Sequence, residues 1–431
     1  MSDTGHQTAF VRAEILPEAP PPIQEQGIFK WLRENLFSSP ANTVLTLAAA
    51  WALYQLVTAV APWLLNGVWT TSSLSACREV LDGSVGACFS VLTERWNQLL
   101  FGFKYPPELY WRPLLALALL FVALAPLLFA KVFPRKLLAM TAVYPFLAFY
   151  LIWGGTILVP AFAMLGFVVG YLVYIRLVYQ SAAMGLIGGV AAALVLWYFG
   201  GYVTEPLANV LALEPVKSRD MGGFMLNLML GVICVSLSLP FGILLALGRQ
   251  SHMPIIKWIS VVFIEFIRGV PLITLLFVAN VVLAYFLPPE SNLDLILRVI
   301  IMITMFASAY IAEVIRGGLA ALPKGQYEAA DSLGLDYAQS MQLIILPQAL
   351  KISIPGIVNV SVGLFKDTTL VSVISMFDLV GMIRGPILSA AEWNGVYWEL
   401  FGFAALLFFV TCYGISQYSQ WLERQLTREN Q

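Results

Sequence analysis

The chain has 431 residues, of which 59% are hydrophobic and only 11% are charged. A soluble globular domain is about half apolar and about a quarter charged, so this composition excludes one. Together with a mean hydropathy of +0.81, it indicates a polytopic membrane protein. The formal net charge of -1 offers no basic field to nucleic acid, which we do not expect as a partner.

The first 42 residues are polar and include the run Pro20-Pro21-Pro22. A cleavable signal peptide would place its short apolar region much nearer to Met1. We therefore predict that residues 1–42 form a disordered or surface-lying tail, followed by an uncleaved membrane span.

Ten apolar runs are long enough to cross a hydrocarbon core of about 30 Å, which takes about 20 helical residues. They cover residues 43–65, 113–130, 137–153, 157–179, 182–200, 222–248, 258–287, 293–315, 353–377 and 397–421. The third and fourth runs are separated by little more than Gly154-Gly155, so an alternative with one kinked span gives nine. Either count predicts an all-α, polytopic helical membrane protein.

The short loops predict the orientation, because Lys and Arg are retained on the cytoplasmic side. With a cytoplasmic amino terminus, ten spans give inner loops that carry Lys131, Arg135, Lys136, Arg176, Arg249, Lys257, Arg316, Lys324, Lys351, Arg424 and Arg428. Nine spans would force one half of the chain to violate the rule. The loop 66–112 then faces outward, where Cys77 and Cys88 can form a disulfide or remain two free thiols. The short end 423–431 is cytoplasmic.

One polar segment interrupts the second half of the chain, between the runs 293–315 and 353–377. Pro323 suits the first turn of a helix and Gly334 suits the left-handed residue just past a helix end, which predicts a short helix over 323–333. Asp336 can cap a second helix over 337–345, and Pro347 is expected to end or kink it. Such a pair of helices is either a cytoplasmic docking surface or an amphipathic connector at the lipid interface.

This segment contains Glu328-Ala329-Ala330, three residues, Gly334, nine residues and Ile344-Ile345-Leu346-Pro347. The pattern resembles the cytoplasmic signature of the membrane subunits of bacterial ABC importers. Around it, IEFIRGVPL at 264–272, AEVIRGG at 312–318 and FKDTTL at 365–370 resemble the polar amino acid permeases of the histidine/glutamine family. The resemblance implies a five-helix type I importer permease core over 222–422. The extra spans of 43–221 resemble those of the general L-amino-acid importer permeases.

In that family the segment corresponding to 323–347 couples the permease to an ATPase, so the resemblance assigns docking to Glu328, Ala329, Ala330 and Gly334. The chain has no G-x-x-x-x-G-K-[ST] phosphate loop, so we expect no cofactor here, with ATP and magnesium on the partner. The implied partners are an ABC ATPase dimer, a second permease subunit (a distinct paralogue or another copy), a periplasmic amino-acid-binding protein and the amino acid itself. The expected location is the lipid of the bacterial inner membrane.

Polar groups within the spans are candidates for the solute path, because they are costly when they face lipid. Asp367 lies twelve residues beyond Pro355, roughly 18 Å along a helix and therefore near the membrane midplane. Thr368 and Thr369 beside it can contact a solute or bond back to their own helix. Alternatively, Asp367 only pairs with Lys366 or with a neighbouring helix.

A second candidate is the pair Glu265 and Arg268, which share a helix face at i and i+3. Gly269 and Pro271 follow at once and can break the helix, as transporters do at solute sites. The alternative is a structural ion pair near the inner interface. Asn280, deeper in the same span, is either a path residue or an interhelical hydrogen-bonding group.

Two other functions fit less well. A secondary transporter driven by an ion gradient would not need a docking segment. A membrane enzyme has few candidate groups, because the only histidines are His6 and His252 and neither H-E-x-x-H nor G-x-S-x-G occurs. We therefore expect a transport subunit and not an enzyme.

Overall fold

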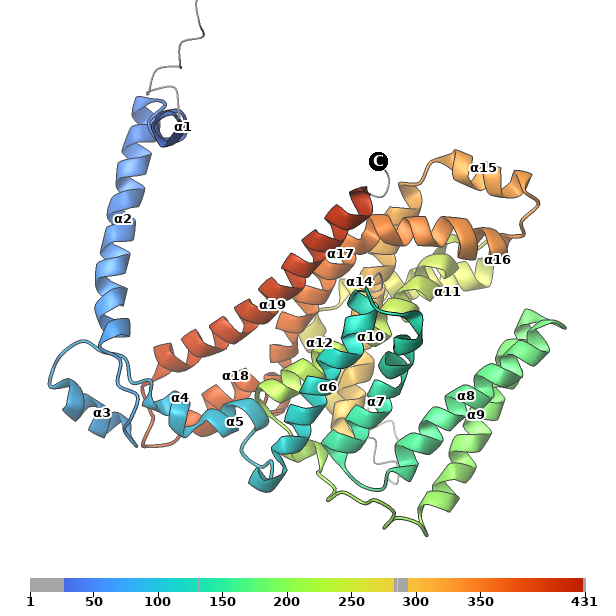
Figure 1. Ribbon diagram of the computed structural model, residues 1–431, viewed down its shortest axis with the longest axis horizontal. Coiled ribbons are helices and arrows are strands. Elements are labelled where there is room, and N and C mark those ends of the chain that lie inside the picture. Colours follow the sequence, from blue (N-terminus) through green and yellow to red (C-terminus); the bar gives the residue numbers. More distant parts are fainter. Residues whose placement is uncertain (1–26, 130–131, 283–284, 286–293, 429–431) are drawn as a thin grey trace, which may run out of the picture. The chain divides into compact units, whose positions relative to one another are not determined.

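The computed structural model describes residues 27–129, 132–282, 285 and 294–428 (Figure 1). Every regular element in this part of the chain is a helix, which confirms the all-α prediction. The chain divides into two compact units, one containing residues 27–68 and 79–87 and the other containing 69–78 and 88–428. Each unit is described by itself.

The smaller unit is built around one apolar helix. Helix α1 (Gly27–Asn35) exposes Ile28, Phe29 and Trp31, and residues 1–26 of the predicted tail lie outside the described residues. Helix α2 (Pro40–Leu65) begins at Ser39, whose hydroxyl accepts a 3.1 Å bond from the Asn42 N–H. None of the α2 residues is buried, as expected for a helix whose surface is covered by lipid.

The larger unit begins with short helices in the loop 66–112 and continues with two pairs of long ones. The elements are α3 (Leu74–Leu81), which runs across the boundary between the units, α4 (Ser90–Glu94), α5 (Trp96–Phe101), α6 (Trp111–Leu128), α7 (Leu138–Trp153), α8 (Leu158–Val178) and α9 (Ala182–Thr204). Gly154 and Gly155 have φ angles of +76° and +81°, which turn the chain between α7 and α8. The two helices are separate, so the alternative of one kinked span is wrong.

The second half of the chain forms the main core. Its elements are α10 (Gly223–Gln250), α11 (Pro254–Gly269), α12 (Leu272–Phe277), η5 (Val278–Val282), α14 (Leu295–Ala320), α15 (Lys324–Ser332), α16 (Tyr337–Ser340), η6 (Met341–Ile345), α17 (Leu346–Asp367), η7 (Thr368–Ile374), α18 (Leu379–Met382), η8 (Ile383–Ile387) and α19 (Tyr397–Arg428). Helix α14 packs against both α10 and α17, and α17 packs against α19. Leu226, Leu230, Val299 and Ile303 are fully buried in this core.

Nine of the described helices are long and apolar enough to cross a membrane, and the pair α11 and α12 makes a tenth if it is counted as one span. This pair is bent by 102°, which confirms the predicted break at Gly269 and Pro271 within the run 258–287. Val270 has extended backbone and Pro271 has no N–H to continue the helix, which together account for the bend.

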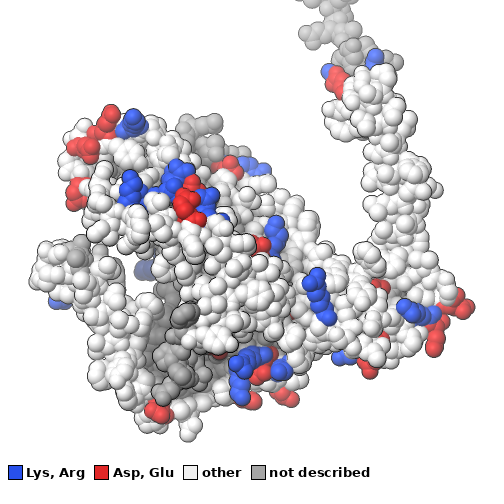
Figure 2. Space-filling model, turned by 180° about the vertical axis from the view of Figure 1, so that it is seen from behind, with Lys and Arg blue, Asp and Glu red and all other residues white. Residues whose placement is uncertain are grey.

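Charged side chains are unevenly distributed over the larger unit. On the face drawn in Figure 2 they gather mainly toward its two ends, and the surface between them is largely uncharged. This distribution suits a helix bundle whose middle lies in hydrocarbon.

Candidate functional site

The segment after α14 folds as a helix, a glycine turn and a second helix. Helix α15 starts after Pro323, which occupies the N-cap and not the first helical position. At its end, Leu335 N–H donates to the Ala330 carbonyl (3.3 Å) and Gly334 N–H donates to the Asp331 carbonyl (2.9 Å). These two bonds form a Schellman motif, which needs a left-handed residue, and Gly334 has φ +70°. The predicted helix and turn are confirmed.

The second helix begins with a complete capping box. Gln339 N–H donates to Asp336 Oδ1 (2.8 Å) and Asp336 N–H donates to Gln339 Oε1 (3.1 Å), which confirms Asp336 as the cap. Of the two expectations for Pro347, the one that it ends this helix is wrong, and the one that it kinks the helix stays a prediction. Helix α16 continues through the π-helical turn η6 into α17, and Pro347 lies in the first turn of α17 directly after that wider turn.

The surface of this segment is mostly open to solvent. Glu328, Ala329 and Gly334 are exposed, and the apolar side chains of Leu333 and Tyr337 are 72% and 55% exposed. Ala330 has no exposed surface, so the expectation that it contacts a docking partner is wrong, since it is buried within its own chain. Helices α15 and α16 lie at one end of the larger unit (Figure 1). Exposed apolar groups among polar ones are typical of an interaction surface.

A network of ion pairs lies at the helix ends that lead to this segment. Arg249 at the end of α10 binds Glu265 of α11 (2.9 Å) and Glu313 of α14 (3.3 Å). Glu313 also pairs with Arg268 at 3.7 Å and accepts a 2.9 Å bond from Arg316 Nε. The network therefore joins three helices near the end of α14 that precedes α15.

The predicted pairing of Glu265 with Arg268 is not found. Glu265 binds Arg249 instead, while Arg268 pairs with Glu313 and lies 5.6 Å from the ring centroid of Tyr310. Both residues thus belong to a structural network, which favours the alternative of a structural ion pair over a solute site. The i,i+3 spacing identified a shared helix face but not the competing cations and anions on neighbouring helices.

Asp367 is the last residue of α17 and is half-buried. The helix starts at Leu346 and not near Pro355, so the starting point of the 18 Å estimate is wrong, while the position of Asp367 near the membrane midplane stays a prediction. Asp367 makes no hydrogen bond or ion pair within the described part of the chain. The hydroxyl of Thr369 bonds back to the Lys366 carbonyl at 2.9 Å.

Thr368 belongs to a buried polar cluster that the sequence did not reveal. The side-chain amide of Asn227 donates to Thr368 Oγ1 (3.0 Å) and to Asp378 Oδ2 (3.1 Å), and its oxygen accepts from Leu379 N–H (3.0 Å). None of the side chains of Asn227, Thr368 and Asp378 is exposed. Thr368 therefore does not face a solute path, and instead connects α10, η7 and α18.

Asp378 caps α18, accepting bonds from the N–H groups of Val380 (3.2 Å) and Gly381 (2.9 Å). Burial raises the pKa of this carboxyl to about 6, although the bonds from Gly381, Asn227 and Val380 act in the opposite direction. An aspartate directly before an apolar run is an N-cap signal that sequence reasoning could have used.

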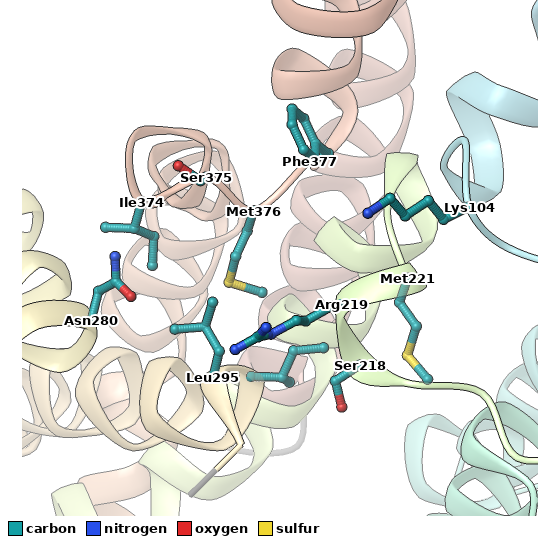
Figure 3. Close-up of a pocket in the computed structure, with 11 residues that line it drawn as sticks. Lys104, Ser218, Arg219, Met221, Asn280, Leu295, Ile374, Ser375, Met376 and Phe377 are labelled. Carbon is teal, nitrogen blue, oxygen red and sulfur yellow. The ribbon is translucent and has the colours of Figure 1, made fainter. Parts of the chain in front are cut away.

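At the other end of α14, Asn280 lines a cavity of about 320 Å³ (Figure 3). Its own backbone carbonyl, in the π-helical turn η5, accepts a bond from Arg298 (3.3 Å). The other polar lining residues are Lys104, Ser218, Arg219 and Ser375.

Cys77 and Cys88 form a disulfide, so the second of the two possibilities, free thiols, is excluded for this pair. Their Cα atoms are 6.0 Å apart. The Cys88 N–H donates to Glu399 Oε1 (2.9 Å), which ties the loop to the start of α19. No group of three or more His, Cys, Asp and Glu side chains that could hold a metal ion occurs among residues 27–129, 132–282, 285 and 294–428.

A bundle of long apolar helices with an exposed helical hairpin at one end is the architecture of a polytopic helical membrane protein. Comparison with known proteins identifies the family. The family described as "Binding-protein-dependent transport system inner membrane component" matches residues 238–427. The chain is 52% identical, over the whole length of both proteins, to the glutamate/glutamine/aspartate/asparagine transport system permease protein BztC of Rhodobacter capsulatus.

The chain is also 37% identical to the inner membrane amino-acid ABC transporter permease protein YhdY of Escherichia coli, over 95% of this chain and 96% of that one. Among solved structures, it is 31% identical to a chain of an amino acid ABC transporter with histidines, with a TM-score of 0.42 over 47% of this chain and 92% of that one. The chain belongs to the family of inner-membrane permease subunits of binding-protein-dependent amino-acid ABC importers. The family resemblance of its motifs is confirmed, and a secondary transporter is not favoured.

Proposed function

We propose that this permease subunit forms half of a path for amino acids and is driven by a separate ATPase that docks on α15, Gly334 and α16. The observation that carries the proposal is the exposure of this segment. It presents Glu328 and Ala329 together with Leu333 and Tyr337, apolar groups that a partner would remove from water. An exposed carboxylate at Glu328 offers a charge to a basic groove.

The solutes we propose are the acidic amino acids and their amides. The supporting observation is the identity of 52% over the full length to a relative whose name states those four solutes. ATP and magnesium would be held by the partner, an ABC ATPase dimer. A second permease subunit would supply the other half of the path, and a periplasmic binding protein would deliver the solute.

The orientation we propose has both termini in the cytoplasm, as the loop cations predict. Under this orientation α15 faces the cytoplasm and the Cys77–Cys88 disulfide faces the oxidising periplasm. The domain division remains the one predicted from sequence, with a tail over 1–42, an extension over 43–221, a core over 222–422 and a tail over 423–431. Within the core, we keep Asp367, Thr369 and Asn280 as candidates for the path.

The test is the ATPase activity of the complete reconstituted assembly with its binding protein, measured across a panel of solutes. We expect glutamate, glutamine, aspartate and asparagine to stimulate hydrolysis, because loaded binding protein signals through the permease. Sugars and metal ions serve as controls and should give only the basal rate. Stimulation by a sugar or a metal ion without stimulation by any amino acid would contradict the proposed solute class.

A further inference from the structure

The cavity that contains Asn280 lies at the end of the core remote from the docking segment. Leu295 and Ile296, the first residues of α14, line it, whereas α14 ends at Ala320, shortly before α15. A helix of 26 residues rises about 39 Å, so the cavity and the docking segment are separated by roughly the thickness of a membrane. Under the proposed orientation the cavity faces the periplasm, from which solute arrives.

Four separate parts of the chain form the cavity. Lys104 comes from the loop between α5 and α6, Arg219 from η4 (Ser218–Asp220) before α10, Asn280 from η5, and Ser375 from the residue that follows η7. In Figure 3 Lys104 lies on one side of the cavity and Asn280 and Ser375 on the other, with the Arg219 side chain between them. The volume of about 320 Å³ is at the lower end of the range of about 300–1,000 Å³ typical of small-molecule pockets.

The charge of the cavity is unbalanced. Lys104 and Arg219 both line it, and none of its described lining residues is Asp or Glu. Within the described part of the chain neither cation forms an ion pair, and the Lys104 ammonium lies only over the ring of Phe103, 5.4 Å from its centroid. Two exposed cations without a protein anion provide an attractive field for an anionic solute.

The remaining lining groups suit the rest of an amino acid. Asn280 and Ser375 can accept hydrogen bonds from an ammonium group, and Ile296, Ile374 and Met376 supply buried apolar wall. Ser375 has φ +64°, a left-handed conformation that is uncommon outside glycine, at the point where η7 ends. The left-handed backbone turn at Ser375 therefore forms this part of the cavity wall.

We propose that this cavity is an entry site for anionic amino acids, in which Lys104 and Arg219 bind the carboxylate that distinguishes an acidic amino acid from its amide. The inference rests on the proposed function, since it assigns a specificity to the same path. A glutamate molecule has one net negative charge at pH 7 and a glutamine molecule has none. Two uncompensated cations thus favour the acid, and both belong to the extension over 43–221.

The experiment compares glutamate with glutamine uptake in proteoliposomes that contain the complete assembly and saturating binding protein. The variants are Lys104→Gln and Arg219→Gln, and the matched control is Lys217→Gln. Lys217 is an exposed cation two residues from Arg219 that does not line the cavity. The ratio of the two uptake rates cancels any loss of assembled complex.

We expect each cavity variant to lower the ratio of glutamate to glutamine uptake about 1.4- to fivefold, the range for one exposed charge contact. The effect should shrink at high salt, and Lys217→Gln should leave the ratio unchanged. An equal loss of both solutes would instead indicate contacts with the binding protein or with lipid head groups and would overturn the inference. Unchanged uptake of both would also overturn it. A wild-type assembly that no amino acid stimulates contradicts the proposed function itself.

Discussion

Asp378 joins three elements of the core, α10, η7 and α18, through its own hydrogen bonds and those of Asn227. It caps α18, it accepts a bond from Asn227 of α10, and Asn227 in turn binds Thr368. An N-cap contributes about 1 kcal/mol, and leaving a buried partner without its bond costs about 1–3 kcal/mol. The cluster therefore fixes three elements against each other where α17 has ended.

The raised pKa of Asp378 leads to a prediction about pH. Because its pKa is about 6 in the folded protein and the ordinary value is 3.8, the carboxyl takes up a proton on folding between about pH 4 and pH 6. The free energy of unfolding should therefore fall as pH rises through this window. The variant Asp378→Asn keeps a capping side chain and has no such titration.

We expect the Tm of the purified wild-type protein, minus that of Asp378→Asn, to become smaller between pH 4.5 and pH 7.5. Thermal unfolding followed by tryptophan fluorescence in detergent measures both values, and the subtraction removes all other titrating groups. A difference that stays constant over this range would contradict the assigned pKa.

The residues of this protein were predictable from sequence to different degrees. Gly334 and Asp336 were predictable, because helix-end chemistry depends on the local chain. Glu265 and Arg268 were not, since Arg249 and Glu313 compete for them from other helices. Asn227 and Asp378 are 151 residues apart, and no local pattern links them.

At the scale of elements, the turn after α15 decides how the docking segment is presented. Gly334 has φ +70° and no atom within 4 Å of an added Cβ, so a substitution there is opposed by backbone conformation and not by crowding. Gly325, in the first turn of the same helix, also has open space but no positive φ. Gly325 therefore serves as a control position for an alanine substitution at Gly334.

We predict that Gly334→Ala destabilises the end of α15 by about 1–2 kcal/mol, because a left-handed conformation costs a side chain that much. Amide hydrogen exchange in α15 should become about five- to thirtyfold faster. Gly325→Ala should leave exchange unchanged or slow it, since alanine is favoured in helices by about 0.5–1 kcal/mol. Equal exchange rates in both variants would show that the Schellman turn does not hold this helix.

Among the elements, prolines gave the least reliable predictions. Pro271 breaks a span as its missing N–H suggests, whereas Pro347 lies in a continuous helix because η6 shifts the hydrogen-bonding register just before it. The sequence does not show whether a proline will break its helix, as Pro271 does, or lie within a continuous helix, as Pro347 does. The hydrophobic runs, by contrast, located nearly all long helices, since length and apolar composition are local properties.

At the scale of the whole molecule, the core places a solute-sized cavity at one end of α14 and a docking segment at the other. The ion-pair network of Arg249, Glu265, Arg268, Glu313 and Arg316 lies between α10, α11 and α14 near the docking end. Its members are 22–53% exposed, so it contributes little to stability as separate surface pairs.

The central claim is that force from a separate ATPase enters through α15, and ATP-driven uptake by the variant Glu328→Lys tests it most directly. The control is Glu94→Lys, the same charge reversal at an exposed residue of α4, in the loop that we place in the periplasm. We predict that Glu328→Lys inserts and accumulates normally but takes up no amino acid above background, whereas Glu94→Lys retains uptake. Normal uptake by Glu328→Lys would contradict the account.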